Sequence, residues 1–173
     1  AAPGVPGLAE AGYLTSTTAL ELEELPESLI VLGGRYIALE LSQMFARLGS
    51  KVTILQRSSR LLPSETVDIT EALTGYLVAE GIQVITGAAL QAVRHDRTGF
   101  MVEARVEGRT ECFQAAQLLV ATGRRPNTAG LGLEQVGVAL NPDDTVQVDD
   151  HLQTTVPGIY AAGDVIGDPA FVY

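Results

Sequence analysis

The first sustained hydrophobic pattern along the chain predicts a strand, a glycine turn, a helix and a second strand. Leu29–Leu32 is a short continuous apolar run, which is typical of a strand buried on both faces. Gly33-Gly34 follows, and apolar residues then recur at helical spacing over Ile37–Leu48. Gly49 is a natural helix end, and Val52–Leu55 forms the next apolar run. This order and spacing predict one right-handed βαβ crossover.

Farther along the chain the hydrophobic period changes from helical spacing to alternation. A second helix is expected over Val67–Glu80, followed by a strand at Ile82–Ile85. Alternating runs separated by turn-like segments then predict a three-stranded antiparallel meander, with strands at Ala92–His95, Phe100–Val106 and Cys112–Ala115. Leu118–Ala121 is expected to return to the parallel sheet. The predicted fold class is therefore α/β, Rossmann-like, with a parallel sheet, helices and an inserted meander.

The two ends of the chain carry weaker patterns. Residues 1–26 contain three prolines and predict a connector with one short helix over Ala19–Glu24, capped by Ser16 or Thr17. Toward the other end, Gly158–Ala162 is the last strand candidate.

Composition narrows the classes of function. The net charge is −10 and the eleven Lys and Arg residues are scattered, which disfavours nucleic acid as a partner. The single cysteine, Cys112, excludes an internal disulfide or a cysteine-rich metal site, and its strand-like surroundings predict a small core residue. His95 and His151 are expected at the surface, and no metal ligands are assigned. No apolar run approaches the ~20 residues that span a bilayer, so we expect no membrane partner and a cytoplasmic location.

The glycine turn is the first candidate binding site. In a dinucleotide-binding turn the first glycine makes the tight turn, the second admits the pyrophosphate, and the third lets the helix pack on the strand. Gly33 fills the first role and Ala38 nearly fills the third, but Arg35 stands where the second glycine is expected. Arg35 is interpreted either as a phosphate partner or as a solvent-facing side chain at a loosened turn. The candidate residues of the turn are Gly33, Gly34, Arg35, Tyr36 and Ile37.

The end of the second strand favours one nicotinamide cofactor over the other. An NAD site usually has a carboxylate here that binds the ribose 2′-hydroxyl, and Gln56 removes it. Arg57 and Arg60 add two cations that suit a 2′-phosphate, with surface arginines as the alternative interpretation. The sequence therefore predicts NADPH as the bound nucleotide.

Four segments together resemble a known family, the two-dinucleotide flavoprotein disulfide oxidoreductases of the class I pyridine nucleotide-disulfide type. They are Pro3–Leu8, Gly33–Glu40, Ala121–Thr128 and Thr154–Val165. The resemblance implies an FAD/NAD(P)-binding fold. It divides the chain into a connector from the FAD domain (1–26), an NAD(P)H-binding domain (27–146) and a return strand into the FAD domain (147–173).

The same resemblance implies roles for individual residues. Tyr36 matches the tyrosine that lies over the flavin, and Glu40 matches the glutamate that pairs with a lysine beside the flavin, so both are expected as catalytic residues. Asp164, after Gly163, matches an FAD-binding aspartate. Three residues match the segment that closes the nicotinamide domain and complete the cofactor-binding candidates: Thr122, Gly123 and Arg124. Most FAD contacts are expected from outside this chain.

Within the family, Ala46–Thr53, Leu55–Ser58 and Gly167–Tyr173 resemble the mercuric reductase branch. This resemblance implies a homodimeric enzyme that passes electrons from NADPH through FAD and a cysteine pair to Hg(II), giving Hg(0). The Cys-x4-Cys pair that this chemistry needs is not in the chain, so we expect these 173 residues to be inactive alone. An NAD-dependent dihydrolipoamide dehydrogenase and a non-catalytic nucleotide-binding module stay open as alternatives.

Overall fold

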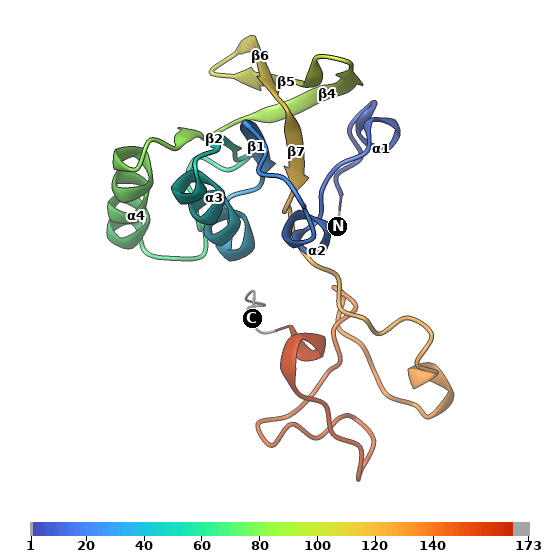
Figure 1. Ribbon diagram of the computed structural model, residues 1–173. Helices are drawn as coiled ribbons and strands as arrows, with labels where there is room; N and C mark the ends of the chain where they lie inside the picture. The colour runs from blue at the N-terminus through green and yellow to red at the C-terminus, as the bar shows by residue number, and fades with distance from the viewer. Residues whose placement is uncertain (1, 168–173) are drawn as a thin grey trace. The chain divides into compact units, whose positions relative to one another are not determined.

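The computed structural model describes residues 2–167, which form two units (Figure 1). One unit ends at Gly123 and the other begins at Arg124. The predicted nucleotide-binding range extends past this boundary to residue 146, and the roles assigned to the three sequence ranges stay predictions. Among residues 2–167, no helix is both long and apolar enough to cross a bilayer.

The first unit is built on a four-stranded parallel sheet. Its helices and strands in chain order are α1 (Leu8–Ala11), α2 (Ser16–Leu20), β1 (Ser28–Leu32), α3 (Tyr36–Leu48), β2 (Lys51–Leu55), α4 (Val67–Ala79), β3 (Gln83–Ile85), β4 (Ala89–Asp96), β5 (Gly99–Val106), β6 (Arg109–Ala115) and β7 (Gln117–Val120). The parallel sheet has the order β3-β2-β1-β7, and β4-β5-β6 form the predicted antiparallel meander. The predicted α/β fold class is confirmed, and so is the position of the meander before the last parallel strand.

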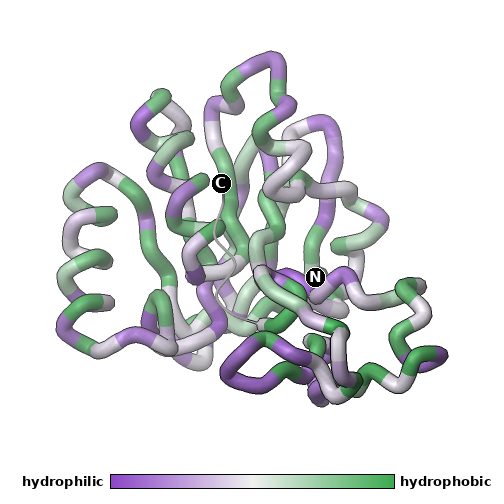
Figure 2. Tube along the Cα trace, turned by 90° about the horizontal axis from the view of Figure 1, so that it is seen from below, coloured by the Kyte–Doolittle hydropathy of each residue, from purple (hydrophilic) through white to green (hydrophobic). Residues whose placement is uncertain are grey.

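Strand β1 is buried on both faces because each face has its own cover. Leu29 and Val31 belong to a core cluster with residues of α3 and α4. Ile30 and Leu32 alternate with them and belong to a second cluster, which contains residues of the meander. Along the trace, hydrophobic and hydrophilic stretches alternate, and several of the outer bends are hydrophilic (Figure 2). This two-sided burial explains why the sequence of β1 is a continuous apolar run rather than an alternating one.

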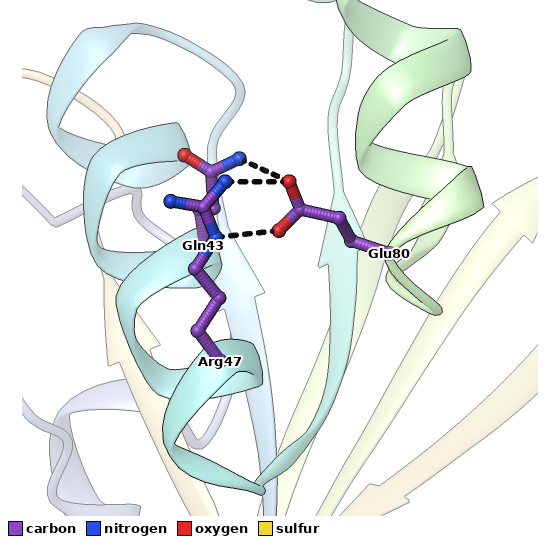
Figure 3. Close-up of polar contacts among 3 residues, drawn as sticks. All are labelled: Gln43, Arg47 and Glu80. Atoms are coloured by element: carbon purple, nitrogen blue, oxygen red, sulfur yellow. Dashed lines mark hydrogen bonds and ion pairs between the residues drawn. The ribbon is translucent and has the colours of Figure 1, made fainter.

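Helices α3 and α4 are joined by a surface cluster of polar side chains (Figure 3). The Glu80 carboxylate accepts bonds from Arg47 Nε at 2.8 Å and Arg47 Nη2 at 2.7 Å, and also from Gln43 Nε2 at 2.9 Å. The bidentate bond to Arg47 lowers the pKa of Glu80 and raises that of Arg47. The cluster fixes the end of α4 against α3, next to strand β3.

Two local expectations are wrong. Helix α2 covers Ser16–Leu20 and is capped by Thr15, whose Oγ1 accepts from Thr18 N while Thr18 Oγ1 accepts from Thr15 N. The capping pair therefore starts the helix three residues before the expected Ala19. Cys112 is exposed rather than a core residue. It lies on β6, an edge strand that is exposed along most of its length. Successive side chains of a strand point to opposite faces, so Cys112 points away from the face of the half-buried Phe113.

The second unit is held mainly by turns. Its regular elements among the described residues are two short 3₁₀ helices, η1 (Leu133–Gln135) and η2 (Gly163–Ile166). The strand expected over Gly158–Ala162 is also wrong: Tyr160 makes an isolated bridge with Gln153, and η2 follows. A strand needs a hydrogen-bonded neighbour along its length, and the described part of this unit offers isolated bridges instead. Most of the segment Gly167–Tyr173 lies outside the described residues.

Candidate functional site

A cavity of about 700 Å³ lies in the first unit, at the carboxyl ends of three neighbouring parallel strands. β1 contributes Gly33-Gly34, β2 contributes Leu55–Ser58, and β7 contributes Ala121-Thr122. Pro3–Val5 and Ala88–Leu90 complete most of the lining. In open α/β sheets, ligands bind outside the carboxyl ends of the strands, so the cavity is where the fold predicts a binding site.

The glycine turn forms one wall of the cavity, and both of its glycines are closely packed. Gly33 has φ 120°, and a Cβ there would lie 2.9 Å from the carbonyl carbon of Ala121. A Cβ on Gly34 would lie 2.8 Å from Leu61 Cδ2. Ala38 is fully buried in the core cluster that contains Val31. The turn therefore has the tight geometry that the sequence predicts for a dinucleotide-binding turn.

The start of α3 faces this site without a capping side chain. Arg35 is the N-cap residue, and no side chain caps the helix or adds an acidic charge to its first turn. The first N–H groups of a helix have no partner within the helix, and together with the helix dipole they favour a bound anion. Arg35 is exposed and lines the cavity. The turn therefore offers both backbone donors and a cation to a phosphate group.

The charges around the cavity have one sign. Among the described residues that line it, the only charged ones are Arg35 and Arg57, although the whole chain has a net charge of −10. Ser58 adds a hydroxyl group to the lining. A cavity with cations and hydrogen-bond donors, and without carboxylates, suits an anionic ligand.

The structure separates the three residues predicted to select the cofactor. Arg57 is exposed and lines the cavity. Gln56 also lines it but is only 7% exposed, and its side chain packs under Gly34. Arg60 is directed elsewhere, because its Nη2 donates to the carbonyl of Pro63 at 2.8 Å. Arg60 is not among the residues that line the cavity, and its Nη1 is buried without a hydrogen-bond partner among the described residues.

The remaining candidates of the turn pack beside the cavity rather than line it. Tyr36 and Ile37 are half-buried against the core cluster under α3. The hydroxyl of Tyr36 donates to the carboxylate of Glu65. This bond, with burial and the negative charge of Glu65, raises the pKa of Tyr36. Glu40, one helical turn after Tyr36, is exposed on α3.

The candidates near the unit boundary divide between the two units. Thr122 lines the cavity, and Gly123 ends the first unit. In the second unit, Arg124 Nη1 lies 3.6 Å from Asp164 Oδ2, and both side chains are about half exposed. Gly163 is the first residue of η2. Among the described residues, no group of three His, Cys, Asp or Glu side chains is gathered to hold a metal ion.

Sequence reasoning missed several residues of the site. Ala88–Leu90 line the cavity, and they could have been found because they follow the carboxyl end of β3, the neighbour of β2. Pro63 also lines it, from the segment between β2 and α4. Glu65, the partner of Tyr36, lies 29 positions along the chain from it, and no local pattern connects the two.

The family model that matches this chain is described as "Pyridine nucleotide-disulphide oxidoreductase" and covers residues 1–173. The mercuric reductase of Staphylococcus aureus is 46% identical over 173 residues, which are 100% of this chain and 32% of that protein. The mercuric reductase of Streptomyces lividans is 48% identical over 172 residues, 99% of this chain and 36% of that protein. The chain thus spans about a third of the length of these relatives.

Solved structures agree with this similarity. The HOCl-induced flavoprotein disulfide reductase RclA from Escherichia coli is 38% identical, with a TM-score of 0.84 over 99% of this chain and 39% of that one. LpdA from Mycobacterium tuberculosis is 33% identical, with a TM-score of 0.78 over 90% of this chain and 33% of that one.

Proposed function

The chain belongs to the pyridine nucleotide-disulphide oxidoreductase family, and from that premise we propose that it is the NADPH-binding segment of an FAD-dependent enzyme that reduces Hg(II) to Hg(0). The observation that carries the NADPH assignment is the cavity at the strand ends, where both charged lining residues are arginines. NADPH has one more phosphate group than NADH, on the 2′-oxygen of its adenosine ribose. A lining with cations and without carboxylates favours the more anionic of the two nucleotides.

The residues present fit this cofactor. The uncapped start of α3 and the tight glycine turn would hold the pyrophosphate, and the guanidinium group of Arg35 would add a positive charge beside it. Arg57, which is exposed at the cavity, would bind the 2′-phosphate. Gln56 is buried under Gly34 and brings no negative charge to the site. When bound, NADPH supplies a hydride, which carries the two electrons that convert Hg(II) to Hg(0).

The second unit contributes to the FAD site in this proposal. The carboxylate of Asp164 would accept hydrogen bonds from hydroxyl groups of the cofactor, and its present ion-pair partner is Arg124 at 3.6 Å. At that distance, with both side chains about half exposed, the pair is weak, so it does not prevent Asp164 from exchanging partners. Most FAD contacts are expected from the rest of the protein.

The Hg(II) assignment rests on the similarity to mercuric reductases at 46% and 48% identity. Hg(II) is a soft cation that binds thiolates, and this chain contains only Cys112, which is exposed on β6. We therefore assign the thiol pair to the remainder of the enzyme. The complete protein should oxidise NADPH only when Hg(II) is added, and release Hg(0). Failure to consume NADPH with Hg(II) would contradict the substrate assignment.

Titration calorimetry of the chain with NADPH and NADH tests the nucleotide assignment. We expect tighter binding of NADPH. Arg57→Gln should weaken NADPH binding about tenfold and leave NADH binding unchanged, since only the 2′-phosphate contact is lost.

Arg97→Gln is a matched control, because Arg97 is exposed between β4 and β5 and is not among the cavity residues. Tighter binding of NADH would instead support an NAD-dependent dihydrolipoamide dehydrogenase.

A further inference from the structure

Part of the cavity lining lies outside the helices and strands, in the connection between β2 and α4. The segment from Gln56 to Thr66 connects β2 to α4, and Pro63 from this segment lines the cavity. Leu62 beside it has φ 41°, in the left-handed region that a leucine rarely adopts. A conformation of this kind persists only where the surrounding contacts fix it, so the contacts of Leu61–Glu65 decide the shape of the wall.

Three contacts tie Leu61–Glu65 to the glycine turn and to the start of α3. Leu62 N donates to the Gly34 carbonyl at 2.8 Å, and Leu61 is fully buried against Gly34. Glu65 N donates to the Leu62 carbonyl at 2.9 Å and thereby closes the turn around Pro63. The third contact is the bond from the Tyr36 hydroxyl to the Glu65 carboxylate, beside which the neighbouring Ser64 side chain also interacts with Tyr36.

Glu65 is an unexpected residue at this place. A carboxylate close to a site for an anionic ligand opposes binding by Coulomb repulsion, and the cavity lining contains no acidic residue among those described. The half-buried carboxylate is instead engaged by Tyr36, which follows the N-cap residue Arg35 directly. The Tyr36–Glu65 bond therefore connects the phosphate-facing helix start to the wall that contains Pro63.

We infer that Glu65 is a positioning residue of the nucleotide site: through Tyr36 it fixes Leu61–Glu65, and with it Pro63, as a wall of the cavity. This inference rests on the proposed nucleotide-binding function. Glu65 touches no cavity atom in this role and acts only through Tyr36. Loss of the bond removes one restraint on the wall, and the bound nucleotide must then supply part of that restraint, which lowers affinity.

A double-mutant cycle with NADPH as the probe tests the inference. Tyr36→Phe and Glu65→Ala each remove the same bond, so each should weaken NADPH binding about fivefold. The double variant should bind no more weakly than either single variant, because the bond can be lost only once. Glu65→Gln retains an acceptor oxygen and should restore part of the affinity. Independent, additive losses, unchanged affinity in Glu65→Ala, or no rescue by glutamine would each overturn the inference.

Matched controls are available on α4. Glu71→Ala removes an exposed carboxylate and Tyr76→Phe removes an exposed hydroxyl, with Tyr76 69% exposed. Both should leave NADPH binding unchanged.

A second measurement does not depend on the nucleotide. The chain has five tyrosines and no tryptophan, so ultraviolet absorbance follows tyrosine ionisation directly. One tyrosine of the wild type should ionise above the others, because ionisation breaks the Tyr36–Glu65 bond and sets two negative charges side by side. Glu65→Gln should return it to the main group. If Glu65→Gln leaves the tyrosine titration unchanged and the wild type binds NADPH, this inference is overturned but the proposed function is not. A wild type that does not bind NADPH overturns both the proposed function and this role of Glu65.

Discussion

Gly33 offers the sharpest test of the site's geometry, because the glycine is required there by both its backbone angle and its neighbours. The change Gly33→Ala places a methyl group in a conformation with φ 120°, which costs a non-glycine residue about 1–3 kcal/mol. The added Cβ would also lie 2.9 Å from the carbonyl carbon of Ala121, a backbone atom that cannot rotate away.

Relief of this overlap requires the ends of β1 and β7 to separate. One backbone bond holds these ends directly, Ala121 N to the Leu32 carbonyl at 2.9 Å, whereas Gly33 N donates to the Leu55 carbonyl of β2 at 3.0 Å. The bond between Ala121 and Leu32 is worth about 1 kcal/mol. We therefore expect Gly33→Ala to lower the free energy of unfolding by about 2–4 kcal/mol and to weaken NADPH binding, since Ala121 and Gly33 both line the cavity.

Two other glycines separate the cost of the backbone conformation from the cost of the steric overlap. Gly81 has φ 87° but open space around its Cβ position, so Gly81→Ala should show the backbone cost alone, about 1–2 kcal/mol. Gly75 lies inside α4, and a Cβ added there would have no neighbouring atom within 4 Å. Gly75→Ala should therefore stabilise the chain by about 1 kcal/mol. Urea unfolding followed by circular dichroism measures all three variants, and the midpoint for Gly33→Ala should fall by about 1.5 M. A Gly33→Ala variant no less stable than Gly81→Ala would refute the packing argument.

Two further predictions concern the parts of the fold outside the cavity. Thr15→Ala removes the capping pair of α2 and should lower the free energy of unfolding by about 1 kcal/mol in urea unfolding, whereas Thr17→Ala leaves the pair intact and should not. Glu80 has a lowered pKa because Arg47 binds it, so its contribution to stability is present above its ordinary pKa of 4.5 and is lost as the pH falls through the lower value in the folded chain. Glu80→Gln should flatten the dependence of urea midpoint on pH in that acidic window, Glu71→Gln should not, and equal slopes in all three proteins would contradict the prediction.

The sequence was sufficient for the parallel sheet and its helices because their signals are local. A strand covered on both faces must be apolar at consecutive positions, and β1 is. A helix with one covered face must repeat its apolar residues at helical spacing, and the C-cap of α3 lies at Gly49, as predicted. The meander could be predicted for the same reason, because apolar and polar residues alternate within its strands and turn-like segments separate them.

Side-chain directions depend on contacts between distant segments and therefore did not follow from the sequence. Cys112 lies in a strand-like run, but it is exposed because β6 is an edge strand. Gln56 and Arg60 are only four positions apart, yet one packs under Gly34 and the other donates to Pro63. The partnership of Tyr36 with Glu65 needs the whole β2–α4 connection to fold back on α3 before the two residues meet.

These directions, rather than the net charge, determine which ligand the cavity favours. A chain with a charge of −10 repels an anion at long range, but salt screens that repulsion over about 8 Å under physiological conditions. Within that distance the backbone donors of α3 and the exposed Arg57 act directly on the ligand. Arg60 does not add a third cation to the lining, because its Nη2 donates to the Pro63 carbonyl at the wall of the cavity. Two arginines that are equivalent in the sequence thus have different consequences in the fold: Arg57 acts on the ligand, whereas Arg60 acts on the segment that shapes its site.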